Sequence, residues 1–122
     1  MEAHVKYMLL ICRDEPAWEK LSATERQRIH TEMVELSDEL ASRGQYLSGF
    51  PLQPSSSATS VRVRDGKRLV TDGPFAETRE QLGGYMLIDV KDLDEAIAIA
   101  ARIPLARTST VEVRPVREGP PK

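Results

Sequence analysis

The stretch KYMLLIC, residues 6–12, decides the architecture because apolar side chains occupy both of its faces. Successive side chains of a β-strand point to opposite faces, so Tyr7 and Leu9 lie on one face and Met8 and Leu10 on the other. A strand that is hydrophobic on both faces is typical of the interior of a sheet that is covered on both sides. The stretch therefore predicts a central strand.

The segment YMLIDV, residues 85–90, has the same two-sided character and predicts a second central strand. Two helices are also indicated. Ser22 and Glu25 have the spacing of a capping box, and Gly44 stands where a left-handed residue ends such a helix. A second helix follows Asp92 and ends before Pro104. Its buried side is predicted to consist of five residues: Leu93, Ala96, Ile97, Ala100 and Ile103.

The other predicted elements are a short strand, a proline- and serine-rich loop, a β-hairpin and a last strand, at residues 45–50, 51–59, 60–71 and 110–116. Asp65-Gly66 forms the tight turn of the hairpin. The tail, residues 117–122, is expected to be frayed. The order predicts a single domain over residues 1–122 with an α+β, ferredoxin-like fold and an inserted hairpin. In that plan the first and third core strands lie in the middle of the sheet.

Two helices can cover only one face of this sheet. The other face would still present hydrophobic side chains from both central strands, and a soluble monomer rarely exposes so large an apolar patch. We therefore expect a second copy to pack its sheet against the first. The predicted partner is thus a second copy of the chain, in a homodimer with a two-fold interface above about 1,000 Å² in total.

Composition excludes several classes of function. The chain has one cysteine, Cys12, so no internal disulfide is expected, and no metal-ligand spacing or cofactor motif is visible. The net charge is −2, and the 17 Lys and Arg residues are scattered among acids, which argues against nucleic-acid binding. The longest apolar run is too short to cross a membrane, and no secretion signal precedes it. A cytoplasmic location is the expectation.

The stretch DGPFAETREQLGGYMLIDV, together with KYMLLI, VRVRDGKRLVTDGPF and VEVRPV, resembles the YCII-related family and its DGPF-type subgroup. The resemblance spans roughly residues 6–117 and implies a dimeric α+β barrel. It also implies a link to transcription, because DGPF-type members are often encoded beside or fused to sigma-factor-like proteins. Some YCII-related proteins are regarded as enzymes with a His and Asp pair in a cleft. One relative is a dehydrochlorinase that acts on a chlorinated hydroxyquinol.

The His and Asp pair of those relatives does not transfer to this chain residue for residue. The histidine precedes the glycine that ends the first helix by about eleven residues. The corresponding position here is Met33, and His30 lies about one turn earlier. The aspartate precedes a proline after the second helix, where this chain has Ile103.

The loop at residues 72–80 has two interpretations. In the first it is a turn, in which Gly73 supplies an unusual φ and Phe75 packs into the core. In the second it borders a cleft and performs chemistry. The candidate catalytic residues are then Asp72, Glu77 and His30, and the candidate ligand-binding residues are Arg13, Pro74, Phe75 and Arg79.

These observations leave open whether the chain is an enzyme. The favoured reading is a protein that holds a small anionic or aromatic molecule in a cleft near the 72–80 loop. One hypothesis adds acid–base chemistry of the elimination type, with Asp72 or Glu77 aided by His30. The alternative is a non-catalytic module that senses a ligand or docks onto a regulatory protein such as a sigma factor.

Overall fold

The computed structural model of the chain describes residues 4–117. Its elements run in the order β1 (Val5–Asp14), α1 (Glu15–Glu19), α2 (Ala23–Ser42), β2 (Tyr46–Pro51), η1 (Ser55–Ser57), β3 (Thr59–Arg64), β4 (Lys67–Asp72), β5 (Glu80–Val90), α3 (Leu93–Arg102), η2 (Pro104–Arg107) and β6 (Val111–Pro115). The η elements are short 3₁₀ helices. A short helix, α1, directly follows β1. Apart from Arg117, the tail expected to fray lies outside the described residues.

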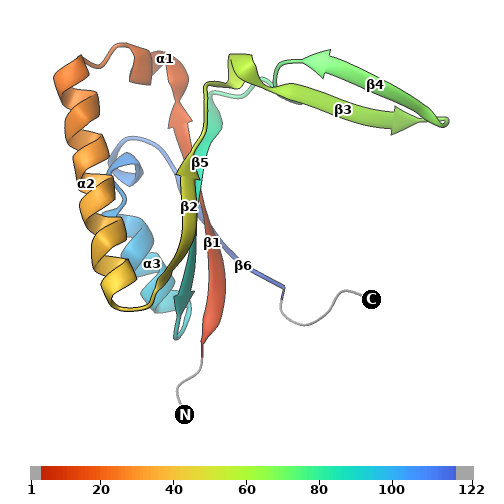
Figure 1. Cartoon of the computed structure of the whole chain (residues 1–122). Helices are drawn as coiled ribbons and strands as arrows, with labels where there is room; N and C mark the ends of the chain where they lie inside the picture. The colour runs from red at the N-terminus through yellow and green to blue at the C-terminus, as the bar shows by residue number, and fades with distance from the viewer. Residues whose placement is uncertain (1–3, 118–122) are drawn as a thin grey trace.

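Four strands form one antiparallel sheet in the order β2-β5-β1-β6. The central strands are β1 and β5, as the sequence predicted. Figure 1 shows α2 and α3 on one side of this sheet, and among the described residues no helix covers the other side. We call that other side the open face. The arrangement is an α+β fold compatible with the ferredoxin-like plan.

The hydrophobic core lies between the helices and the covered face of the sheet. Paired residues lie on the same face of neighbouring strands, and Leu9 pairs with Met86 while Tyr7 pairs with Ile88. Their side chains therefore meet the inner sides of α2 and α3. The buried set consists of Tyr7, Leu9, Ile11, Leu36, Leu40, Met86, Ile88, Val90, Ala96, Ile99, Ala100 and Ile103.

Side-chain caps define where the two long helices begin. Ser22 accepts a hydrogen bond from the Glu25 amide of α2 at 3.1 Å. Asp92 accepts one from the Glu95 amide of α3 at 2.9 Å. Each cap satisfies an amide that has no partner within the first helical turn. Past the end of α2, Gly44 has a φ of 72°, the left-handed conformation that glycine adopts most easily. No helix among the described residues is long and apolar enough to span a bilayer.

The predicted buried side of α3 was wrong in part. Ile97 is 49% exposed and Leu93 is also exposed, whereas Ile99 is only 5% exposed. The helix packs through Ala96, Ile99, Ala100 and the following Ile103, which have the i, i+3, i+4, i+7 spacing of one stripe. Leu93 and Ile97 lie on the neighbouring part of the helix surface. Their spacing to Ala96 and Ala100 is also helical, so periodicity alone does not show which of the two adjacent stripes is buried.

The strands β3 and β4 form a two-stranded antiparallel sheet of their own, which we call the β3–β4 ribbon (residues 59–72). Asp65 and Gly66 join them with φ values of 52° and 73°, the positive values that a tight two-residue turn requires. In Figure 1 the ribbon projects away from the body, on the side of the sheet opposite the helices. It is thus an extension of the fold and not part of its core.

The α3 stripe provides a matched test of the packing. Ile99→Ala should lower the free energy of unfolding by about 2–5 kcal/mol, because it removes buried methyl groups and leaves a cavity. Ile97→Ala, two residues away on the same helix, should change it by no more than about 0.5 kcal/mol. Urea denaturation of both variants measures the difference. Equal losses would contradict the assigned face of α3.

Candidate functional site

A cleft of about 640 Å³ opens between α2 and the covered face of the sheet. This volume falls within the roughly 300–1,000 Å³ that small-molecule sites occupy. The lining side chains and backbone come from β1, α1, α2, β2, β5 and η2: Ile11, Arg13, Trp18, Ala23, Arg26, Gln27, Ile29, His30, Met33, Val34, Ser37, Tyr46, Gly49, Phe50, Pro51, Gly83, Gly84, Tyr85, Met86 and Leu105. Another depression, of about 710 Å³, is lined by α2 residues alone, so it has a single wall and encloses nothing.

The position of Arg13 depends on an irregularity in the sheet. The pairing of β1 with β5 shifts between Ile11 and Cys12, which leaves Gly83 without an opposite residue. A β-bulge of this kind bends the strand and redirects side chains. A Cβ atom at Gly83 would lie 3.1 Å from Cδ and Nε of Arg13. Glycine at this position therefore lets the Arg13 side chain cross β5 at the wall of the cleft.

Arg13 has hydrogen-bonding capacity to spare. Its Nη2 donates to the Leu52 carbonyl at a long 3.4 Å. Its Nε is buried and has no hydrogen-bond partner among the described residues. A buried donor without a partner costs free energy, so an acceptor that reached it would be bound favourably. Arg13 is thus a charged donor at the cleft wall whose capacity the protein itself does not use.

Trp18 of α1 contacts two guanidinium groups. The central guanidinium carbon lies 5.0 Å from the ring centroid for Arg13 and 5.9 Å for Arg26, both within the range of a cation–π contact. Arg26 also donates to the backbone carbonyl oxygens of Trp18 and Glu19, at 3.3 and 2.8 Å. These contacts orient both arginines without neutralising them, because all of the groups they meet are uncharged.

The ionisable basic side chains of the cleft are two arginines and one histidine. Arg13, Arg26 and His30 line it, and none of the described lining residues is acidic. Neither arginine forms an ion pair within the described part of the chain. The rest of the wall is largely apolar. In a chain with a net charge of −2, this is a local concentration of positive charge.

The sequence-predicted site residues fall into two groups. Arg13 and His30 line the cleft, whereas none of residues 72–80 does. Asp72 and Glu77 are exposed, and Pro74 is half-buried. Phe75 is 82% exposed, so it does not pack into the core as the turn interpretation expected. The catalytic roles predicted for Asp72 and Glu77 stay predictions, and both residues lie outside the cleft.

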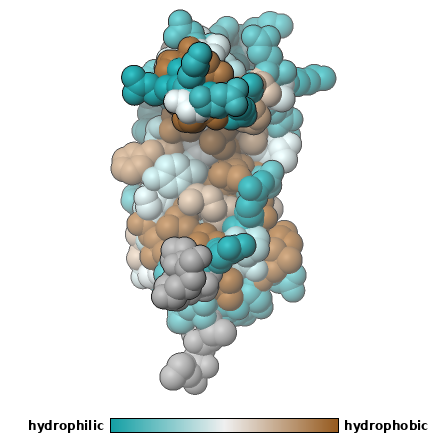
Figure 2. All heavy atoms as spheres, turned by 90° about the vertical axis from the view of Figure 1, so that its right-hand side faces the viewer, coloured by the Kyte–Doolittle hydropathy of each residue, from teal (hydrophilic) through white to brown (hydrophobic). Residues whose placement is uncertain are grey.

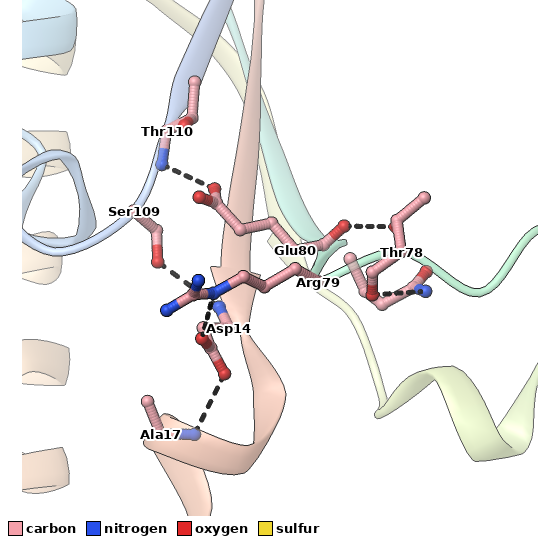
Figure 3. Close-up of polar contacts among 8 residues, drawn as sticks. Asp14, Ala17, Thr78, Arg79, Glu80, Ser109 and Thr110 are labelled. Atoms are coloured by element: carbon pink, nitrogen blue, oxygen red, sulfur yellow. Dashed lines mark hydrogen bonds and ion pairs between the residues drawn. The ribbon is translucent and has the colours of Figure 1, made fainter.

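The loop that contains DGPF is fixed at its far end by polar contacts (Figure 3). The Arg79 guanidinium lies 3.3 Å from a carboxylate oxygen of Asp14. Asp14 also accepts a hydrogen bond from the Ala17 amide, and this contact, followed by the one with Arg79, lowers the pKa of its carboxyl group. The neighbouring Glu80 accepts from the Thr110 amide at 2.9 Å. Arg79 therefore joins the loop to the start of α1.

A second contact joins α1 to the segment before the ribbon. The Glu15 carboxylate accepts hydrogen bonds from the hydroxyl and the amide of Ser55, the latter at 2.7 Å. The hydroxyl bond, then the amide bond, lowers the pKa of Glu15. Asp14 and Glu15 thus hold the chain on both sides of the β3–β4 ribbon.

Cys12 has the properties of a packed thiol. Burial raises its pKa, and the negative charges of Glu80 and Glu112 raise it further. A nucleophilic cysteine requires the opposite shift. Within the described residues, no group of three or more His, Cys, Asp or Glu side chains could hold a metal ion.

Residues 5–119 match the model of the YCII-related domain. The chain belongs to the YCII-related family. It is also similar to an uncharacterized protein of Rhizobium meliloti (strain 1021), with 36% identity over 112 residues that cover 90% of each chain. This YCII-related similarity extends over the whole described fold. It leaves the activity to be argued from the cleft, since the relative is itself uncharacterized.

The sequence reading missed Trp18 and Arg26 as cleft residues. A signal was present, since a lone tryptophan in a chain with 5% aromatic residues is costly to leave without a partner. The contact with Arg26 depends on how α1 meets α2, which no local pattern shows.

Ser55 provides a test of the contact between α1 and the segment before the ribbon. Ser55→Ala removes the hydroxyl bond, so the pKa of Glu15 should rise part of the way back towards its usual 4.5. A lowered carboxyl pKa stabilises the fold above the pKa of the unfolded chain, and this contribution is lost as the pH falls through the folded pKa. The loss of stability in the variant should therefore be largest near neutral pH and disappear in acid.

NMR titration of the Glu15 carboxyl group and thermal unfolding at several pH values measure these effects. The control is Ser56→Ala, which changes the next residue, an exposed serine. Identical titration curves for Ser55→Ala and the wild type would show that the hydroxyl contact does not form in solution.

Proposed function

We propose that this YCII-related protein binds a small organic anion with an apolar body in the cleft between α2 and the sheet. The observation that carries the proposal is the composition of the wall: apolar residues, two arginines, one histidine and no acid among the described lining residues. The apolar part of the ligand would lie against side chains such as Met33 and Leu105. Its anionic group would meet Arg13.

The arrangement of Arg13 favours a carboxylate. A guanidinium presents its N–H groups in a fixed fork that matches two acceptor oxygens. The stacking of Arg13 on Trp18 and the packing against Gly83 restrict its rotamers before any ligand arrives. Less conformational entropy is then lost on binding. The half-apolar surroundings strengthen the attraction relative to water.

Acid–base chemistry is a second candidate, and the position of His30 favours it. His30 is an exposed residue on α2 that lines the cleft, and imidazole is the side chain that changes charge near neutral pH. It could exchange a proton with a bound anion, as an elimination requires. Asp72 and Glu77 would take part only if the 72–80 loop moved towards the cleft. If a ligand binds and no covalent bond in it is made or broken, the alternative is a non-catalytic protein. Such a protein would sense the ligand or dock onto a regulatory protein.

The tetrapeptide Asp-Gly-Pro-Phe at residues 72–75 further supports a place in the DGPF-type subgroup. In that subgroup the alternative of a sensing module linked to a sigma factor carries more weight. A cytoplasmic location fits both functions.

The single tryptophan makes ligand binding measurable. Benzoate and salicylate should change the fluorescence of Trp18, whereas the uncharged benzamide should bind more weakly because it offers Arg13 no negative charge. Arg13→Gln should weaken binding of the carboxylates by at least about tenfold, the equivalent of 1.4 kcal/mol. Arg28→Gln is the matched control, because Arg28 lies on α2 outside the cleft. Equal binding of benzoate and benzamide would overturn the proposal.

His30→Ala tests the second candidate with the same probe. His30 lines the cleft, so removal of its side chain should weaken the binding of benzoate, while the melting temperature should barely change. A variant that bound benzoate as tightly as the wild type would remove His30 from consideration.

We also propose that a second copy of the chain covers the open face. Alternation along β1 and β5 places Met8, Leu10, Tyr85 and Leu87 on that face, opposite to the buried set. Figure 2 looks onto this side of the molecule, where hydrophobic residues are spread over the surface. Phe50, which lies 6.3 Å from the Tyr85 ring, is exposed on the adjacent edge strand. A second sheet would remove these side chains from water.

Leu10→Arg tests this dimer. Leu10 pairs with Glu112 on β6, so the new arginine can form a cross-strand ion pair within its own protomer while it places a charge in the interface. Sedimentation velocity at micromolar concentration should show a dimer for the wild type and a folded monomer for the variant. The control Leu93→Arg, at an exposed leucine of α3, should remain dimeric. A monomeric wild type would count against the proposal.

A further inference from the structure

The β3–β4 ribbon is more exposed than a two-stranded sheet can tolerate on its own. Every residue of β4 and the distal four residues of β3 are exposed. At its base the Gly73 amide donates to the Ala58 carbonyl at 2.7 Å and the Ser60 hydroxyl donates to the Gly73 carbonyl at 2.8 Å, so these bonds join the two ends of the ribbon to each other and do not attach it to the body. Isolated two-stranded sheets are marginally stable in water. The ribbon therefore needs a further contact.

The two faces of the ribbon differ in chemistry. Cross-strand partners share a face, and Val61 pairs with Val70 while Val63 pairs with Arg68. We call this the valine face. The opposite face carries Arg62, Arg64, Lys67 and the single apolar residue Leu69. One side of the ribbon is thus suited to burial against a hydrophobic surface and the other to water or to acidic groups.

The ribbon projects on the same side as the open face. In Figure 1 the helices lie to the left of the sheet and the ribbon extends to the right. A molecule that covers the open face is therefore placed within reach of the ribbon. Phe75, the exposed aromatic residue three positions after the ribbon's last strand, adds a further unburied apolar side chain at its base.

The charge distribution favours another copy of this chain as that molecule. The ribbon carries four Lys and Arg residues and two aspartates, a net charge of +2, while the whole chain has a net charge of −2. The remainder of the chain thus has a net charge of −4. A basic arm and an acidic body attract each other when the arm of one copy reaches the body of another.

We propose that the β3–β4 ribbon is an arm whose valine face packs against a second copy of the chain. The inference rests on the proposed dimer through the open face and adds a second contact to it. In a two-fold dimer the contact occurs twice, because each protomer extends its arm to the other. Burial of the valine face supplies the support that the ribbon lacks in the isolated chain.

The test exploits the cross-strand pairs. Val63→Glu places a charge on the valine face opposite Arg68, and Leu69→Glu places the same charge on the other face opposite Arg62. Both new side chains can pair with an arginine inside the ribbon, so both ribbons should still form. We expect Val63→Glu to raise the dimer dissociation constant at least about tenfold in sedimentation experiments and Leu69→Glu to leave it nearly unchanged.

A variant without the arm gives an independent measurement. Ala58 and Gly73 are joined by a backbone hydrogen bond, so Asn-Gly can replace residues 59–72 without separating the ends. This variant should keep the circular dichroism of the body and dimerise more weakly. If both this variant and Val63→Glu dimerised as strongly as the wild type, the arm proposal would be wrong. The dimer through the open face would still stand if Leu10→Arg abolished dimerisation. A monomeric wild type whose ribbon bound an acidic protein or a nucleic acid would overturn both proposals.

Discussion

The pairing of β1 with β5 is the interaction on which the other features depend. It places Leu9 beside Met86 and Tyr7 beside Ile88, and so creates the hydrophobic face on which both long helices pack. Each of these strands is also apolar on its other side. Both long helices pack on the same face of the sheet, so the pairing that builds the core also leaves an apolar surface open. The bulge at the end of the same pairing admits Arg13 to the cleft. Core, open face and candidate site thus come from one pair of strands.

Local patterns in the sequence were sufficient for the framework. The two-sided stretch at residues 6–12, the serine and aspartate caps and the Asp65-Gly66 turn each act over a few residues, so each could be recognised without a structure. The cleft could not be recognised in this way. Its wall draws on six elements, and Trp18 meets Arg26 only because α1 folds back on the start of α2. The exposure of Phe75 was missed for a related reason, since the ribbon carries the start of its loop away from the core.

The loop with the DGPF tetrapeptide is the most unusual part of the sequence, yet its described contacts are those of a connector. Gly73 has a φ of 95° and forms the hydrogen bond that closes the base of the ribbon. Arg79 then ties the end of the loop to Asp14. These two contacts account for Gly73 and Arg79, and they give no reason for the exposed Phe75. The ribbon and its loop are thus the part of the chain proposed to contact a second copy, and the cleft is the part proposed to hold a ligand.

The five-residue helix α1 is shared by both of those parts. At its start, Asp14 contacts Arg79 after the ribbon and Glu15 contacts Ser55 before it. Near its end, Trp18 lines the cleft. The same short helix therefore contacts both the chain at the base of the ribbon and the cleft. A substitution that displaced α1 would change the shape of both regions at once.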